Sequence, residues 1–236
     1  MIGGGVMKLK FGLNNNQLKI IAIISMLVDH VGEALFPDVY ILRVIGRFAF
    51  PIFAYMIAEG CKYTRNRVRY LAQIATLGIV CQLVYFFAMG SLYQGILMTF
   101  SLSIITIFAI DLFVKKKNFS SCAVMLLTVA AVIFIAVVMP IIFKDKGFAL
   151  DYGALGVLMP IAVYYLPKKW QKLSASAIIL LARALLYGEY RWFALLAVPL
   201  LMLYNGERGK ANLKYLFYIF YPTHLVVIYL LGLLIR

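Results

Sequence analysis

The chain has 236 residues, of which 64% are hydrophobic and 14% are charged, and its mean hydropathy is +0.94. A soluble domain carries about 45–50% apolar and about 25% charged residues, so this composition excludes a soluble globular protein. The net charge of +14 would suggest nucleic acid in a soluble protein. In a membrane protein, basic residues gather in the loops on one side, so we expect a lipid bilayer and no nucleic acid as partner.

Long apolar runs between short polar breaks predict the elements. A membrane-crossing helix needs about 20 mostly apolar residues, and backbone in lipid must be helical because it has no other hydrogen-bond partners there. We expect an all-α polytopic transmembrane bundle, with one domain over residues 1–236. About nine spans are predicted at residues 19–36, 39–60, 69–89, 94–113, 119–143, 151–167, 174–187, 191–204 and 215–235. Gly188 and Glu189 separate the short seventh and eighth spans, so seven spans, with 174–204 looping back, is an alternative.

The distribution of basic residues predicts the orientation. With nine spans and the N-terminus in the cytoplasm, 16 of the 23 Lys and Arg residues lie in inner segments and five lie in outer segments. The outer group includes Arg183 and Arg191. Because positive charge is concentrated on the cytoplasmic side, this split supports a cytoplasmic N-terminus and an external C-terminus.

The first two spans contain ionisable residues, each of which costs at least about 2.5–3.5 kcal/mol in lipid. Asp29, His30 and Glu33 lie in the first span, and Arg43 and Arg47 in the second. A very short loop makes these helices antiparallel neighbours, so we expect the arginines to pair with Asp29 or Glu33. His30 beside a partly neutralised cluster is a candidate general base. A purely structural ion-pair clamp is the alternative.

Two later spans carry further candidates. His224 and Tyr221 share a face of the last span, where Pro222 opens the helix, and His224 is either a site residue or a satisfied packing residue. Asp151 and Tyr152 open the sixth span, either as substrate-binding residues or as a helix N-cap.

The inner end of the second span carries polar and basic residues that are suited to phosphate groups. The candidates are Glu59, Thr64, Arg65, Asn66 and Arg67. Ordinary positive-inside charge explains them equally well.

Familiar catalytic signals are missing from the sequence. No phosphate-binding G-x-x-x-x-G-K-[ST] loop and no G-x-S-x-G nucleophile elbow occur. The two histidines and three cysteines show no metal-ligand spacing, so we expect no metal.

Several segments resemble the TraX family. The most specific are MLVDHVG at 26–32, preceded by LKIIA at 18–22, and LRVIGRFAFPIF at 42–53. Weaker matches are residues 59–60, 64–66, 151–153 (DYG), 204–206 (YNG), 208–210, 220–222 and 224–225. The resemblance covers nearly the whole chain, although residues from 115 to 145 carry no recognisable motif.

The resemblance implies an acyl-CoA-dependent acetyltransferase of the bacterial cytoplasmic membrane. The family's known activity is N-acetylation of pilin subunits in conjugation systems, so acetyl-CoA is the expected cosubstrate and a pilin or other cell-envelope amine or hydroxyl the acceptor. In this hypothesis His30 deprotonates the acceptor, Asp29 or Glu33 stabilises the imidazolium, and Arg43 or Arg47 stabilises the oxyanion.

In the same hypothesis, His224 orients the acceptor or relays a proton, and the phosphates of acetyl-CoA lie near Arg65 and Arg67. Two other functions remain open. Buried Asp, Glu, His and Arg residues are also typical of a proton-coupled transporter. A non-catalytic assembly or scaffold protein would use the same charges only as clamps.

Overall fold

The structure, a computed structural model, describes residues 12–211 and 213–235, and regular secondary structure in these residues is helical. The elements are α1 (Asn15–Ala34), α2 (Tyr40–Gly46), α3 (Ala49–Tyr63), α4 (Arg67–Met89), α5 (Ile96–Lys116), α6 (Phe119–Ile133), the π-helical turn η1 (Phe134–Val138), α7 (Met139–Ile142), the 3-10 turn η2 (Lys144–Lys146), α8 (Gly153–Tyr165), α9 (Lys169–Tyr187), the 3-10 helix η3 (Glu189–Leu196), α10 (Ala197–Met202) and α11 (Lys214–Ile235). The predicted all-α class is confirmed for the described part of the chain.

Helix α1 begins earlier than the predicted first span, at Asn15 instead of residue 19. The reason is a capping box: the Asn14 side chain accepts a hydrogen bond from the Gln17 backbone N–H, and the Gln17 side-chain oxygen accepts one from the Asn14 backbone N–H. These contacts satisfy backbone donors that a helix start leaves free, so polar residues extend the helix beyond its apolar run.

The predicted second span is two helices, α2 and α3, separated by Arg47 and Phe48. Pro51 explains the break, because it has no backbone N–H to donate to the carbonyl of Arg47 one turn earlier. In the first turn of α3 that missing donor costs nothing. The break therefore consists of Arg47 and Phe48, directly before the longer helix α3.

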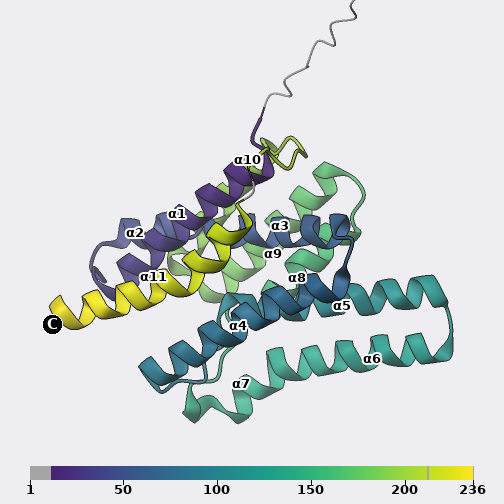
Figure 1. Ribbon diagram of the computed structural model, residues 1–236, viewed down its shortest axis with the longest axis horizontal. Coiled ribbons are helices and arrows are strands. Elements are labelled where there is room, and N and C mark those ends of the chain that lie inside the picture. The colour runs from purple at the N-terminus through teal and green to yellow at the C-terminus, as the bar shows by residue number, and fades with distance from the viewer. Residues whose placement is uncertain (1–11, 212, 236) are drawn as a thin grey trace, which may run out of the picture.

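Helices α1 and α2 pack against each other, as the short connection predicted. Glycines make the approach possible: a methyl group at Gly46 would overlap the Asp29 side chain, and one at Gly32 would overlap Leu42. Helix α11 packs against both α1 and α4, which brings the last helix beside the first (Figure 1).

Four helical stretches are long and apolar enough to cross a membrane: Tyr40–Tyr63, Arg67–Met89, Ile96–Lys116 and Phe119–Ile142. Shorter apolar helices are Gly153–Tyr165 and Ile219–Leu234. These six correspond to six of the predicted spans, and the chain is a helical membrane protein. The total of nine spans and the orientation stay predictions.

The periphery and the centre of the molecule differ in burial. The α6–α7 stretch packs against α5 at one edge (Figure 1), and only 11% of its most apolar window is buried inside the protein. The corresponding share for Tyr40–Tyr63 is 61%. Helix α3 is therefore central, and it packs against α1, α5, α8 and α10.

The seventh and eighth predicted spans are α9 and the η3–α10 pair, and the predicted interruption between them is confirmed. Gly188 ends α9 with a φ of 60°, and Glu189 follows with a φ of 52°. Both are in the left-handed region, which reverses the chain there and places η3 beside α2 and α9.

Replacing Gly46 by Ala should lower stability by about 1–3 kcal/mol, because the added methyl group overpacks the α1–α2 contact. The apparent melting temperature of the purified protein would fall by about 2–4 °C per kcal/mol. Gly232→Ala in α11 is the matched control, since its methyl group would meet Leu35 at an ordinary 3.6 Å. Equal melting temperatures for both variants would contradict the packing argument.

Candidate functional site

The centre of the site is Asp29 of α1, whose carboxylate pairs with two arginines. Arg43 Nη1 lies 3.0 Å from Asp29 Oδ1, and Arg47 Nη2 donates short hydrogen bonds to both Asp29 oxygens. Arg43 Nη1 also bonds Glu33 Oε2 at 3.0 Å. The predicted pairing of both arginines with the carboxylates is confirmed. Asp29 is mostly buried, whereas the Glu33 side chain is 61% exposed and forms the outer edge of the cluster.

Tyr190 of η3 covers the two guanidinium groups and was not predicted. Its ring centre lies 5.3 Å from Arg43 Cζ and 4.8 Å from Arg47 Cζ, within cation–π range. The reversal at Gly188 and Glu189 brings Tyr190 to this position. Nothing in the local sequence around Tyr190 indicates the contact, because its partners are far away in the chain.

His30 and His224 form a direct pair between α1 and α11. Nδ1 of His30 lies 2.9 Å from Nε2 of His224, and the two rings stack with centroids 5.1 Å apart. The packing of α11 against α1 makes the contact. His224 is buried, and its ring also stacks on Phe220, with centroids 4.8 Å apart.

A backbone carbonyl sets the direction of this hydrogen-bond chain. His224 Nδ1 lies 2.8 Å from the Phe220 carbonyl oxygen, which can only accept, so Nδ1 donates. In a neutral His224, Nε2 then accepts from His30 Nδ1. Neutral His30 consequently carries its lone pair on Nε2. This is the nitrogen that remains able to take a proton from a third group.

Tyr221 lies next to this pair and connects it to Asp151 and Tyr152. The Tyr221 ring meets that of His224 edge-on, with centroids 5.6 Å apart, and Tyr221 interacts electrostatically with Asp151 and Tyr152. Tyr152 stacks on Phe50 with ring centroids 3.8 Å apart. Tyr152 occupies the N-cap position of α8, as the N-cap alternative predicted, but its side chain makes no capping hydrogen bond.

Arg183 of α9 completes the cluster, although the sequence indicated it only as one of the basic residues of the outer segments. Its Cζ lies 3.9 Å above the centre of the Tyr152 ring, and it interacts electrostatically with Asp151 and Arg47. Its Nη1 is buried and has no hydrogen-bond partner among the described residues. A buried unpaired donor is costly, so this group is suited to an acceptor supplied by a ligand.

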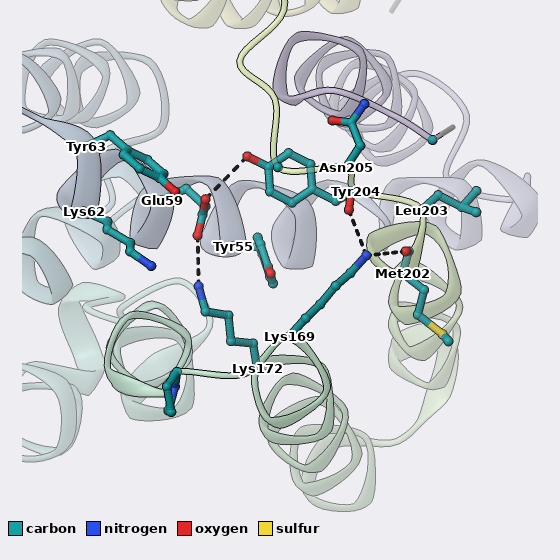
Figure 2. A pocket seen from close by; sticks show the side chains of 13 residues that line it. Tyr55, Glu59, Lys62, Tyr63, Lys169, Lys172, Met202, Leu203, Tyr204 and Asn205 are labelled. Carbon is teal, nitrogen blue, oxygen red and sulfur yellow. Dashed lines mark hydrogen bonds and ion pairs between the residues drawn. The ribbon is translucent and has the colours of Figure 1, made fainter. Parts of the chain in front are cut away.

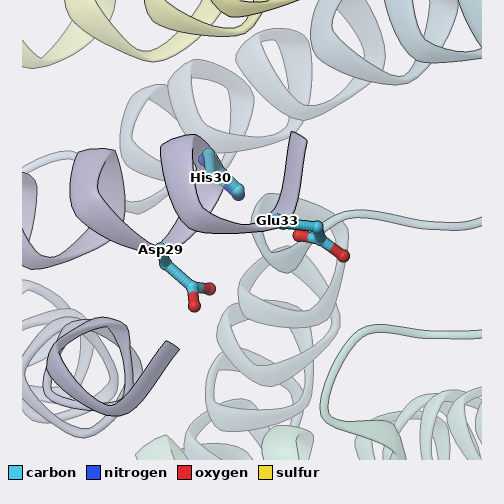
Figure 3. A group of neighbouring side chains, drawn as sticks. All are labelled: Asp29, His30 and Glu33. Carbon is cyan, nitrogen blue, oxygen red and sulfur yellow. The ribbon is translucent and has the colours of Figure 1, made fainter. Parts of the chain in front are cut away.

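Three ligand-type groups, Asp29, His30 and Glu33, gather at the end of α1 with donor atoms within 4.8 Å of one another (Figure 3). The chemistry of the set does not favour a cation. Both carboxylates already accept hydrogen bonds from guanidinium groups, and a metal ion would lie against those positive charges. His30 Nδ1 is turned to His224.

A second polar site lies at the opposite end of α1, around a cavity of about 640 Å³ (Figure 2). Glu59 Oε1 pairs with Lys172 Nζ at 3.0 Å, and both side chains are only 7% exposed. Tyr204 donates a long hydrogen bond of 3.4 Å to Glu59 Oε2. Lys172 and the Tyr204 hydroxyl therefore donate to the two different oxygens of the Glu59 carboxylate.

The other residues predicted to bind acetyl-CoA have structural partners or no described ligand role. Arg67 pairs with Asp111 at 2.6 Å, and Asn66 caps α4 by accepting from the Arg69 backbone. Thr64 donates to the Asn66 carbonyl, and Arg65 is exposed. The structure therefore separates Glu59, which lines the cavity, from this capping segment.

Fold and site together define a helical membrane protein with a buried histidine pair beside an arginine–carboxylate cluster. A family model described as "TraX protein" matches residues 14–232. The chain belongs to the TraX family.

Two curated proteins are similar to this chain in sequence. The probable fimbrial assembly protein FimC, serogroup H1, of Dichelobacter nodosus is 26% identical to this chain over a match 235 residues long. The match includes 90% of this chain and 93% of that protein. The uncharacterized protein RP591 of Rickettsia prowazekii is 35% identical over 66 residues, which cover 28% of this chain and 25% of that protein. No solved structure matches the chain.

Asp29→Asn should be strongly destabilising, by about 3–5 kcal/mol, because it leaves two guanidinium groups without their buried counter-charge. Glu33→Gln is the matched control, since an exposed ion pair is worth about 0–1 kcal/mol. Thermal unfolding of both variants in detergent measures the difference. If Glu33→Gln lowers the melting temperature as much as Asp29→Asn, Asp29 is not the centre of the cluster.

Proposed function

We propose that this TraX-family chain is a membrane-embedded acetyltransferase that transfers acetyl from acetyl-CoA to an amine or hydroxyl acceptor. One observation carries the proposal: the His30–His224 hydrogen bond, whose direction leaves His30 Nε2 free to accept a proton. General-base chemistry needs such a nitrogen within reach of the acceptor. The activity that the TraX resemblance implies supplies the reaction type.

The acceptor is a pilin or another cell-envelope molecule, and the site lies in the bacterial cytoplasmic membrane with the N-terminus inside. The printed name of the Dichelobacter relative, a probable fimbrial assembly protein, supports the choice of a pilus-related acceptor. The concentration of basic residues in the predicted inner segments supports the orientation.

The two histidines have different roles in this mechanism. His30 Nε2 takes the proton of the acceptor amine or hydroxyl while the lone pair of the acceptor nitrogen or oxygen attacks the thioester carbonyl carbon. His30 then returns the proton to the departing thiolate as the C–S bond breaks and a C–N or C–O bond remains. Through its bond to His30, His224 orients the imidazole and accepts positive charge from it.

Arg183 is the better candidate for the oxyanion donor than Arg43 or Arg47. Arg43 Nη1 is engaged with Asp29 and Glu33, and Arg47 bonds both Asp29 oxygens and the Arg43 carbonyl. Arg183 Nη1 is buried and unpaired among the described residues, so it needs no existing bond to break before it donates to a carbonyl oxygen. Asp151 and Tyr152 hold its charge in place.

His30→Gln should reduce acetyl transfer by about 10²–10⁴-fold, the usual contribution of a general base, without loss of folding. The assay follows radiolabelled acetyl transfer and thiol release with the purified protein, acetyl-CoA and a peptide that has a free N-terminal amine. Thr223→Ala, an exposed neighbour of His224 on α11, is the control and should stay active.

Full activity of the His30→Gln variant would overturn the mechanism. Transport of a solute by reconstituted protein that consumes no acetyl-CoA would instead favour the proton-coupled transporter. If paired neutral replacements of Asp29 and Arg47 keep the wild-type phenotype in cells, the scaffold alternative is favoured, because a clamp tolerates such an exchange.

Arg183→Gln should lower kcat by about 10²–10³-fold with little change in KM, as expected for a donor that acts on the developing oxyanion. Arg191→Gln is the control: Arg191 also lies near Tyr187 and Tyr190, but it pairs with Glu189. Equal kcat values for wild type and Arg183→Gln would remove Arg183 from the mechanism.

A further inference from the structure

The cavity at the start of α1 has an excess of positive charge. Its lining contains Lys62, Lys169 and Lys172, against a single carboxylate, Glu59. Glu59 is already paired with Lys172, which leaves two ammonium groups facing the cavity without an ion-pair partner among the described residues. Lys169 Nζ donates to the carbonyl oxygens of Met202 and Tyr204, at 2.7 and 2.8 Å, and these neutral partners do not cancel its charge.

Aromatic rings and a tight loop form the rest of the wall. Tyr55, Tyr63 and Tyr204 line the cavity, and such rings can stack on a planar base. The loop after α10 is held in place by backbone hydrogen bonds, from Leu13 N to Leu203 O at 2.8 Å and from Asn205 N to Leu13 O at 2.9 Å. The YNG segment at 204–206 is therefore part of this wall.

We infer that the cavity binds the phosphate-bearing adenine nucleotide portion of the acetyl donor, with Lys62 and Lys169 as phosphate ligands and the tyrosines as the surface for the base. Two ammonium groups and aromatic rings around one cavity match the charge and the flat ring of such a nucleotide. The inference rests on the proposed function, because that function identifies the donor as acetyl-CoA.

The position of the cavity relative to the histidine pair suits a long donor. Helix α1 runs from the cavity wall to His30, and 15 residues at about 1.5 Å per residue separate Asn15 from His30 by about 22 Å. Coenzyme A has its nucleotide at one end of an extended flexible arm and its thiol at the other. A donor whose nucleotide binds at the cavity must therefore span a separation of this order for its thioester to meet His30.

The segment at 64–67 is the rival position, and its contacts make it less suitable. The Arg67 guanidinium is neutralised by Asp111, and Asn66 is used as a helix cap. The cavity, in contrast, joins residues from α3, α9 and the loop after α10 around one space; in Figure 2 the amino groups of Lys62 and Lys169 lie on either side of the Glu59–Lys172 pair.

The test is equilibrium binding of coenzyme A and of adenosine 3′,5′-bisphosphate to the full-length protein in lipid nanodiscs. Lys62→Gln should raise the Kd of both ligands about tenfold, since a hydrogen bond from a charged donor changes the affinity by about tenfold or more. Lys169→Gln should weaken both ligands to a similar extent. Lys62→Gln keeps the test valid if Lys169→Gln misfolds, because the contact described for the Lys62 ammonium is only with the ring of its neighbour Tyr63, at 5.9 Å from the ring centre. Lys116→Gln, an exposed cation outside the cavity, is the matched control.

The outcomes separate this site from the proposed function. Weaker binding in Lys62→Gln and Lys169→Gln, with unchanged binding in Lys116→Gln, Arg65→Gln and His30→Gln, supports the cavity even if the wild type transfers no acetyl group. Weaker binding in Arg65→Gln with unchanged binding in both cavity variants places the nucleotide at the 64–67 segment and overturns the inference. Absence of coenzyme A binding by the wild type also overturns it.

Discussion

The ion pair of Asp29 with Arg43 and Arg47 is the constraint on which the rest of the structure depends. A buried carboxylate without counter-charge is prohibitively costly, so α2 must approach α1 closely enough for both guanidinium groups to reach it. Gly46 leaves room for that approach. His30 follows Asp29 in the same helix, so the interaction that joins α1 to α2 also determines where the imidazole lies. The clamp and the candidate site are one assembly.

Hydropathy predicted where helices lie better than where they begin or bend. Each predicted apolar run coincides with a helical stretch of the described residues to within a few residues, because burial of apolar side chains in lipid or in the core requires such runs. The errors have local causes that hydropathy does not measure. Polar capping by Asn14 and Gln17 extended α1, and Pro51 divided the second stretch into α2 and α3. The number of spans and their direction depend on the bilayer, and they stay predictions.

The part of the site that sequence could predict is local. Four-residue spacing and a short loop were enough to pair Arg43 and Arg47 with the carboxylates. His30 and His224 were each recognisable as unusual, but their contact spans 194 positions and depends on how α11 packs. Arg183 was missed because near a chain reversal a basic residue looks like a loop charge. Its place in the site becomes clear only from the contact of its guanidinium group with the Tyr152 ring.

The peripheral arm, the helical stretch from α6 to α7, is constrained differently from the polar centre, because most of its apolar window is not buried inside the protein. In a bilayer, side chains in such a position meet acyl chains, which favour apolar character but do not distinguish one branched residue from another. Drift among Val, Ile, Leu, Ala and Phe there changes little in the free energy of the folded state. This is a physical reason why residues 115 to 145 carry no family motif. The arm can match the thickness of different host membranes while the polar interior stays unchanged.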